Sequence, residues 1–129
     1  MPSKRLLSFY GDDFTGSSDV MEAMASRGVR TVLFTRLPTP TELAPYADYE
    51  AIGLAGTSRS QSPAWMDENL PRVFAWLKQL GAAHCHYKVC STFDSSPTVG
   101  SIGRAIDIGR ALAAAGSGKA DGLIVRIRR

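Results

Sequence analysis

Two adjacent carboxylates, Asp12 and Asp13, are the residues of this sequence best suited to chemistry. They lie in the polar stretch 10–18, between an apolar run at 6–10 and a helical pattern that begins near Thr15. A carboxylate at a helix N-terminus can orient a hydroxyl group and accept its proton, and the free N–H groups of the helix favour an anionic ligand. The structural alternative is a single residue that caps the helix. Because the stretch carries five polar side chains rather than one, we predict a ligand site here.

A second polar stretch places one arginine among three hydroxyl groups. Arg59 is surrounded by Thr57, Ser58 and Ser60, a combination that suits a carboxylate or a polyol acid. The alternative is that Arg59 pairs with one of the two aspartates and neutralises buried charge, and both states can hold in turn, before and after a ligand binds. The residues of these two stretches that we predict to bind substrate are Asp12, Thr15, Ser58, Arg59 and Ser60.

A third polar stretch begins at Lys88 and continues through residues 90–96. Lys88 could provide a point charge for an anion or could be an exposed lysine. Asp94 could orient substrate hydroxyls or stabilise its own turn, and the sequence leaves both alternatives open. We predict that Lys88, Ser91 and Thr92 bind substrate. Asp13 and Asp94 are the two candidates for the catalytic base, and the sequence does not choose between them.

Alternating strand and helix patterns must position these stretches. Apolar and β-branched runs predict strands at 4–10, 30–35, 51–55, 84–89 and 123–127. Apolar residues three and four apart predict helices at 15–27, 63–80 and 100–115, with a helical turn at 41–46. Ser62 and Pro63 are typical of a helix start, and Pro71 predicts a kink or a restart. The alternation predicts an α/β fold, a Rossmann-like parallel sheet with helices on both faces, in three layers and incomplete at the C-terminus.

The three polar stretches follow the first, third and fourth predicted strands. The carboxyl ends of parallel strands meet at one edge of the sheet, and ligands of such folds bind beyond that edge. The second predicted strand leads instead into a proline loop at 38–40. We therefore expect one site, built from three strand exits.

The composition indicates a cytoplasmic globular domain. The chain has 129 residues, of which 44% are hydrophobic and 21% charged, and no apolar run approaches the ~20 residues of a membrane span. Four basic residues and one acidic residue among the last eleven account for the whole formal charge of +3, which is weak evidence for a nucleic-acid surface. The two cysteines and two histidines lack further ligands at metal spacing, so we expect reduced thiols and no metal site. We expect neither a membrane nor a nucleic acid as partner.

Four motifs resemble the signatures of the four-carbon acid sugar kinases. They are Tyr-Gly-Asp-Asp-Phe-Thr-Gly-Ser at 10–17, Ala-Gly-Thr-Ser-Arg-Ser at 55–60, His-Tyr-Lys-Val-Cys-Ser-Thr-Phe-Asp-Ser-Ser at 86–96 and Gly-Ser-Ile-Gly-Arg at 100–104. Enzymes of that family use ATP to phosphorylate tetronates such as threonate, erythronate or 3-oxo-tetronate. The resemblance implies that this chain corresponds to their amino-terminal, sugar-acid-binding domain. The residues that it places on the sugar-acid side are Asp12, Asp13, Arg59, Lys88, Ser91 and Asp94, with Ser101 and Arg104 as weaker candidates.

The resemblance also implies what this chain does not contain. In that family a second, carboxyl-terminal domain binds the nucleotide, so ATP and Mg²⁺ are expected mainly on that missing domain. The expected partners of this chain are the nucleotide domain and the acid sugar. The resemblance fades near Ala113. We therefore expect residues 1–115 to form part of the sugar-acid-binding domain, and residues 116–129 to be a divergent tail with a candidate fifth strand. A fragment, a frameshifted product and one piece of a split enzyme all fit this pattern.

Catalysis by this chain alone is not expected, because the resemblance assigns the ATP contacts to the other domain. The alternative is a stand-alone binding module for small hydroxy acids. A phosphatase with a phospho-aspartate intermediate is disfavoured, because the adjacent carboxylates Asp12 and Asp13 would not project together. The preferred tetronate and the oligomeric state, a homo-oligomer included, are not determined by the sequence.

Overall fold

A computed structural model describes residues 5–89, 95–115 and 123–127. Its core is a five-stranded, wholly parallel sheet with the strand order β2-β3-β1-β4-β5. The strands are β1 (Leu7–Gly11), β2 (Thr31–Phe34), β3 (Ala51–Ala55), β4 (His84–Val89) and β5 (Leu123–Ile127). The central strand β1 pairs with β3 on one side and with β4 on the other. The predicted parallel α/β sheet is confirmed.

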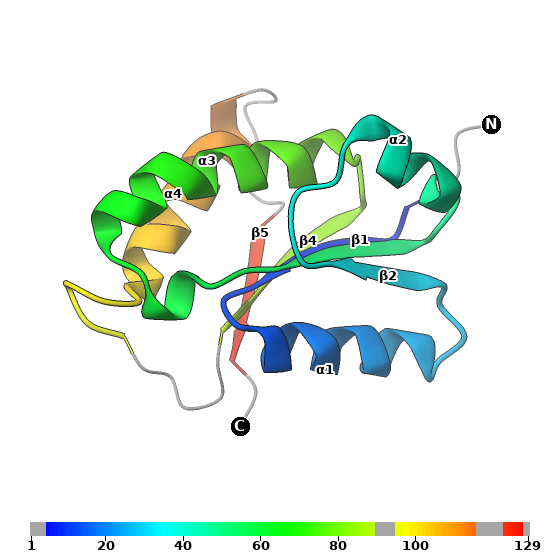
Figure 1. The fold of residues 1–129 in the computed structure, drawn as a ribbon, viewed down its shortest axis with the longest axis horizontal. Helices are drawn as coiled ribbons and strands as arrows, with labels where there is room; N and C mark the ends of the chain where they lie inside the picture. The colour runs from blue at the N-terminus through cyan, green and yellow to red at the C-terminus, as the bar shows by residue number, and fades with distance from the viewer. Residues whose placement is uncertain (1–4, 90–94, 116–122, 128–129) are drawn as a thin grey trace.

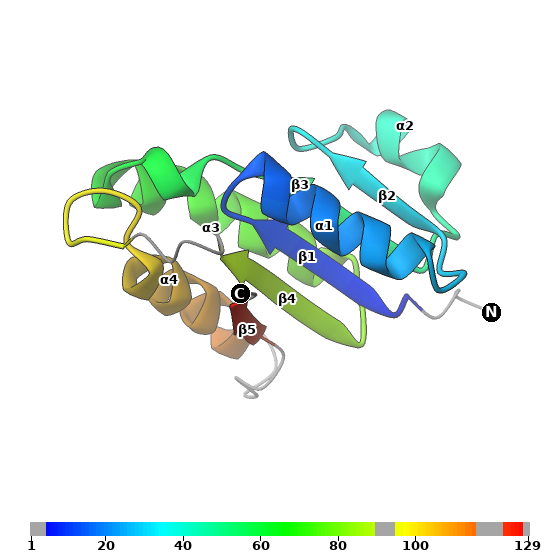
Figure 2. The same cartoon turned by 90° about the horizontal axis from the view of Figure 1, so that it is seen from below.

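Helices cover both faces of the sheet (Figure 1). The helix α1 (Phe14–Ala25) lies on one face, and α3 (Pro63–Gln79) and α4 (Ile102–Ala115) lie on the other. Figure 2, seen from below, shows α1 in front of the strands and α3 behind them. The physical reason is the hand of the crossovers. The connection from β1 to β2 runs toward one edge of the sheet, and those from β3 to β4 and from β4 to β5 run toward the opposite edge. With right-handed connections, opposite directions place the connecting helices on opposite faces. The three predicted layers are thus present.

Several element boundaries differ from those expected, each for a local reason. The first strand extends to Gly11 because its partners continue to Ala55 and Lys88 at the same level. The third long helix begins at Ile102 rather than at residue 100, because Ser101 Oγ accepts a hydrogen bond from the Arg104 amide, which is typical of a cap. The predicted turn at 41–46 is the short helix α2 (Pro40–Leu43) followed by a 3₁₀ turn η1 (Ala44–Tyr46).

The helix α3 starts as predicted and ends within one residue of the predicted end. Ser62 caps it by accepting a hydrogen bond from the Trp65 amide, and Pro63 occupies its first turn. The helix continues through Pro71 without the restart that we considered. Proline removes one backbone hydrogen bond, while Leu70 and Phe74 on either side of it are buried against the sheet. This packing holds the two halves of α3 together.

The main core lies between the sheet and α3. Tyr10, Phe74 and Tyr87 form an aromatic cluster there, with ring centroids 5.7 Å apart for Tyr10 and Phe74, 5.9 Å for Tyr10 and Tyr87, and 6.4 Å for Phe74 and Tyr87. Such pairs stabilise a fold by about 0.5–1.5 kcal/mol each beyond their buried area. The cluster lies near the carboxyl ends of β1 and β4, directly beneath the polar stretches. The polar stretches therefore begin at strand ends that are packed against a buried aromatic cluster.

Candidate functional site

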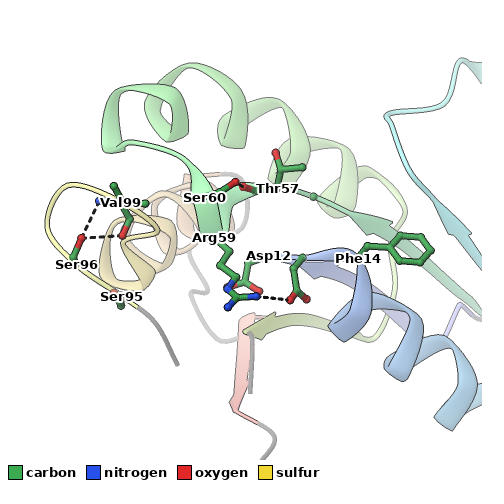
Figure 3. A pocket seen from close by; sticks show the side chains of 10 residues that line it. Asp12, Phe14, Thr57, Arg59, Ser60, Ser95, Ser96 and Val99 are labelled. Carbon is green, nitrogen blue, oxygen red and sulfur yellow. Dashed lines mark hydrogen bonds and ion pairs between the residues drawn. The ribbon is translucent and has the colours of Figure 1, made fainter. Parts of the chain in front are cut away.

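A cavity of about 700 Å³ opens at the carboxyl edge of the sheet. Its lining comes from the turn after β1, from the segment after β3 that includes the 3₁₀ turn η2 (Ser58–Ser60), and from the loop before α4 (Figure 3). The lining residues are Asp12, Asp13, Phe14, Gly56, Thr57, Arg59, Ser60, Ser95, Ser96 and Val99. The convergence of these stretches on one edge, which the strand order predicted, is thus seen in the described part of the chain.

Asp13 has two roles within the fold. Its Oδ1 atom accepts a hydrogen bond of 2.8 Å from the Gly16 amide and so caps α1. Its Oδ2 atom lies 3.3 Å from Nη1 of Arg59. A carboxylate held at both oxygen atoms has little freedom to rotate, so Asp13 presents a fixed negative charge to the cavity. The capping interpretation and the ligand-site interpretation of this residue are therefore compatible.

Asp12 is almost completely buried, with 2% of its surface exposed. Its backbone links the three stretches, because its amide donates to the Lys88 carbonyl at 3.0 Å and its carbonyl accepts from the Arg59 amide at 3.1 Å. These two hydrogen bonds tie the exit of β1 to the end of β4 and to η2. Asp12 thus contributes to the position of Arg59 through the backbone, in addition to any contact of its side chain.

Arg59 reaches from η2 toward the carboxylates at the end of β1 (Figure 3). Its side chain is 36% exposed and that of Asp13 is 20% exposed, so water screens the pair. An ion pair of this kind contributes about 0.2–1 kcal/mol. A carboxylate of a ligand can therefore compete for the guanidinium at small cost. The pairing anticipated as the alternative role of Arg59 is present, and it leaves the guanidinium accessible.

Among the described residues, three other predicted site residues lie outside the cavity lining. Ser58 and Lys88 are buried, with 1% and 3% of their surfaces exposed, and Thr15 is exposed on the first turn of α1. The Lys88 ammonium lies on the α1 side of the sheet and donates a 2.6 Å hydrogen bond to the Val89 carbonyl. Ser91, Thr92 and Asp94 fall outside the described residues. Substrate contacts by these six residues stay predictions.

A buried hydroxyl pair lies beneath the cavity wall. The hydroxyls of Tyr10 and Ser58 are inaccessible to solvent and make no hydrogen bond within the described structure. Burial raises the pKa of Tyr10 from its ordinary 10.0 to about 12, and the nearby Ser58 offsets part of this shift although it lies outside hydrogen-bonding geometry. Burial, followed by the negative charge of Asp12, also raises the pKa of Tyr87. Both tyrosines are therefore neutral at physiological pH.

Two apolar residues at the rim of the cavity were not anticipated. Phe14 is 60% exposed and Val99 is 51% exposed, although both are large hydrophobic side chains. A phenylalanine within the otherwise polar stretch 10–18 was the available signal in the sequence. Val99 lies in the loop before α4, where Ser96 Oγ accepts a 3.0 Å hydrogen bond from the Val99 amide and closes a tight turn.

The two weaker candidates of the fourth motif have structural contacts. Ser101 caps α4, and the Arg104 guanidinium pairs with Asp67 of α3, with Nε donating to Oδ1 at 2.6 Å. Arg104 thus joins α4 to α3.

Among the described residues, no three His, Cys, Asp or Glu side chains are grouped to hold a metal ion. In that same part of the chain, none of the helices has the length and apolarity that a membrane crossing requires.

Comparison with known proteins decides the family. The family model of the sugar-binding N-terminal domain matches residues 7–125, which is most of the chain. The chain belongs to this family. The match includes every stretch that lines the cavity, so the site at the carboxyl edge is part of a sugar-binding domain.

Similar proteins share this domain within longer chains. A 3-oxo-isoapionate kinase from Paraburkholderia graminis is 61% identical over 108 residues, which are 84% of this chain and 23% of the relative. A 3-oxo-tetronate kinase from Methylobacterium radiotolerans is 37% identical over 105 residues, 81% of this chain and 24% of the relative. A solved Haemophilus influenzae protein is 32% identical with a TM-score of 0.65, covering 78% of this chain and 24% of that one. The chain thus spans about a quarter of the length of the relatives it matches.

Proposed function

We propose that this chain is the substrate-binding domain of an ATP-dependent kinase that phosphorylates acid sugars. The observation that carries the proposal is the pairing of an accessible guanidinium, Arg59, with a fixed carboxylate, Asp13, in one hydroxyl-lined cavity. The first suits the carboxylate of an acid sugar, and the second suits one of its hydroxyls. The names of the similar kinases support this assignment.

The substrate class follows from what these kinases have in common. Both names describe 3-oxo acids, which carry a carboxylate and a carbonyl group. The cavity lining beside Arg59 offers hydroxyl donors in Thr57 and Ser60 for the remaining oxygen atoms. The relative at 61% identity makes 3-oxo-isoapionate the first substrate to test, ahead of the tetronates threonate, erythronate and 3-oxo-tetronate.

The proposed reaction needs little covalent chemistry from the domain. The oxygen of a substrate hydroxyl attacks the γ-phosphorus of ATP, the bond from that phosphorus to the β,γ-bridging oxygen breaks, and ADP leaves. The hydroxyl proton passes to Asp13, which is already oriented by its bond to the Gly16 amide. Asp94 is the alternative base. ATP and Mg²⁺ are bound mainly by a separate nucleotide domain in this proposal, in keeping with the greater length of the relatives.

Binding of acids to the chain itself tests the substrate part of the proposal. Calorimetric titration with 3-oxo-isoapionate, 3-oxo-tetronate and D-threonate should show weak binding, and the neutral polyol threitol should bind less tightly. Arg59→Lys should weaken acid binding about tenfold, because a guanidinium that can donate two hydrogen bonds to one carboxylate is replaced by an ammonium that acts as a point charge. Equal affinities for threonate and threitol, or an unchanged acid affinity in folded Arg59→Lys, would remove Arg59 from the site.

Phosphate transfer tests the kinase part. The chain alone should transfer no phosphate from ATP to any of these acids, and addition of a separately expressed nucleotide domain from the Paraburkholderia graminis relative should restore transfer. Turnover by this chain alone would contradict the two-domain proposal. Acid binding without any rescue would instead favour the stand-alone hydroxy-acid binding module.

A further inference from the structure

Gly100 occupies a backbone conformation that other residues rarely adopt. Its φ angle is +62°, in the left-handed region, and the residue is buried. It belongs to the fourth motif of the sequence, and it follows directly on Val99 at the rim of the cavity. A φ angle in this region accounts for a glycine here, but it does not explain why the residue is buried.

The explanation is a close approach to the backbone of Arg59. A Cβ atom placed on Gly100 would lie 2.2 Å from the Arg59 carbonyl oxygen, 3.0 Å from its carbonyl carbon and 3.4 Å from its Cα. The Gly100 amide also donates a 2.7 Å hydrogen bond to the Gln61 carbonyl at the end of η2. A backbone oxygen cannot rotate away as the tip of a side chain can. Any side chain at position 100 must therefore displace the backbone at Arg59.

Arg59 is held from two sides by these contacts. On one side its amide donates to the Asp12 carbonyl at 3.1 Å. On the other side its carbonyl rests against Gly100. The loop that carries Gly100 is itself anchored, because the Ile102 amide donates to Ser95 Oγ at 3.0 Å. The guanidinium thus extends from a backbone that is fixed between the exit of β1 and the loop before α4.

We propose that Gly100 is a positioning residue that places Arg59 for the carboxylate of the substrate. This inference deepens the proposed function and rests on it. The absent side chain lets the loop before α4 press against η2, and that contact sets where the guanidinium lies in the cavity. Gly100 need not touch the substrate, since it acts through the backbone of Arg59.

Two substitutions separate the steric contact from the backbone strain. Gly100→Ala adds both a Cβ atom and an unfavourable φ angle, whereas Gly100→Asn adds the Cβ atom but tolerates the left-handed conformation better. Gly81 provides the matched control, because its φ angle is +68° and a Cβ atom there would meet nothing within 4 Å. Gly103→Ala controls for a helical glycine with open space around it.

The measurements are the affinities for D-threonate and threitol, and the chemical shift of the Arg59 backbone amide in ¹⁵N-labelled chain. Gly100→Asn and Gly100→Ala should weaken threonate binding about tenfold, as Arg59→Lys does, and should change threitol binding by less than about twofold. The Arg59 amide should shift in both variants. Gly81→Ala and Gly103→Ala should leave the affinities and the amide shift unchanged.

A double-mutant cycle completes the test. Gly100→Asn should cost no further affinity in the Arg59→Lys background, because both changes act on the same contact. Additive losses, equal losses for threonate and threitol, or an unshifted Arg59 amide would overturn the inference, as would a Gly100→Asn chain that fails to fold. The unsubstituted chain could bind no acid while the Arg59 amide still shifts in the Gly100 variants. In that case the proposed function would fail, and the coupling between the backbones of Gly100 and Arg59 would stand.

Discussion

Replacement of Asp13 separates the structural role of this carboxylate from its chemical one. One oxygen caps α1 through the Gly16 amide at 2.8 Å, and the other pairs with Arg59 at 3.3 Å. Asp13→Ala removes both contacts. Asp13→Asn keeps an oxygen that can cap the helix and removes the charge. The two variants should therefore differ in stability and resemble each other in the loss of the chemical role.

The geometry sets the size of the effect. Loss of a capping side chain costs about 1 kcal/mol, and loss of an ion pair this exposed costs about 0.2–1 kcal/mol. Asp13→Ala should thus lower the free energy of unfolding by about 1–2 kcal/mol. In a chain of this length that corresponds to a fall in Tm of roughly 3–10 °C. Asp13→Asn should lose only the ion-pair part, about 0.5 kcal/mol.

Thermal and urea unfolding followed by circular dichroism measure these differences. Asp19→Ala is the control, because Asp19 lies on the same helix without a hydrogen bond or ion pair among the described contacts. Equal destabilisation by Ala and Asn at position 13 would refute the capping argument. In the two-domain kinase that we propose, Asp13→Asn should lower turnover much more than substrate affinity. A fully active Asp13→Asn enzyme would shift the role of base to Asp94.

Three further predictions concern residues around the site. Tyr10→Phe removes a buried hydroxyl that has no hydrogen bond in the described structure, so the unfolding free energy should stay the same or rise by about 1 kcal/mol. Burial raises the folded pKa of Tyr10 from 10.0 to about 12, so folded and unfolded chains are equally protonated at this residue below pH 10, and stability falls as the pH rises from 10 toward 12 because the unfolded tyrosine ionises first. Tyr10→Phe should reduce that alkaline loss, measured by unfolding at pH 9–12. Arg104→Met breaks a half-exposed pair with Asp67, so it should cost at most about 1 kcal/mol in chemical unfolding. The sequence predicts a substrate contact for Lys88, but its ammonium does not line the cavity; Lys88→Met should therefore change threonate affinity by less than about threefold in calorimetric titration.

Each of these predictions has a clear contrary result. A destabilised Tyr10→Phe chain would show that the hydroxyl has a partner that the geometry does not reveal. A tenfold loss of acid affinity in folded Arg104→Met would place Arg104 in the site rather than between two helices. A loss of affinity in Lys88→Met as large as that in Arg59→Lys would show that the lysine reaches the ligand.

Much of this site was predictable because its position depends on strands and helices, which local and periodic sequence patterns specify. The alternation of apolar runs with helical patterns determined the parallel sheet, and the parallel sheet determined that the exits of β1, β3 and β4 meet at one edge. Asp12, Asp13, Arg59 and Ser60 could therefore be assigned to one site without any knowledge of distances. The cap at Ser62 was predictable for the same reason, since a cap depends only on its immediate neighbours.

The tertiary structure alone decided which polar side chains face the cavity. Ser58 follows the same strand exit as Arg59, and Lys88 lies near the end of β4 at the same edge of the sheet. Both are nevertheless buried, because the turn η2 directs Ser58 toward the aromatic cluster and strand alternation directs Lys88 to the α1 face. The contact between Gly100 and the Arg59 carbonyl joins residues 41 positions apart. No local pattern encodes such a contact, because it depends on how α3 and α4 pack together over the sheet.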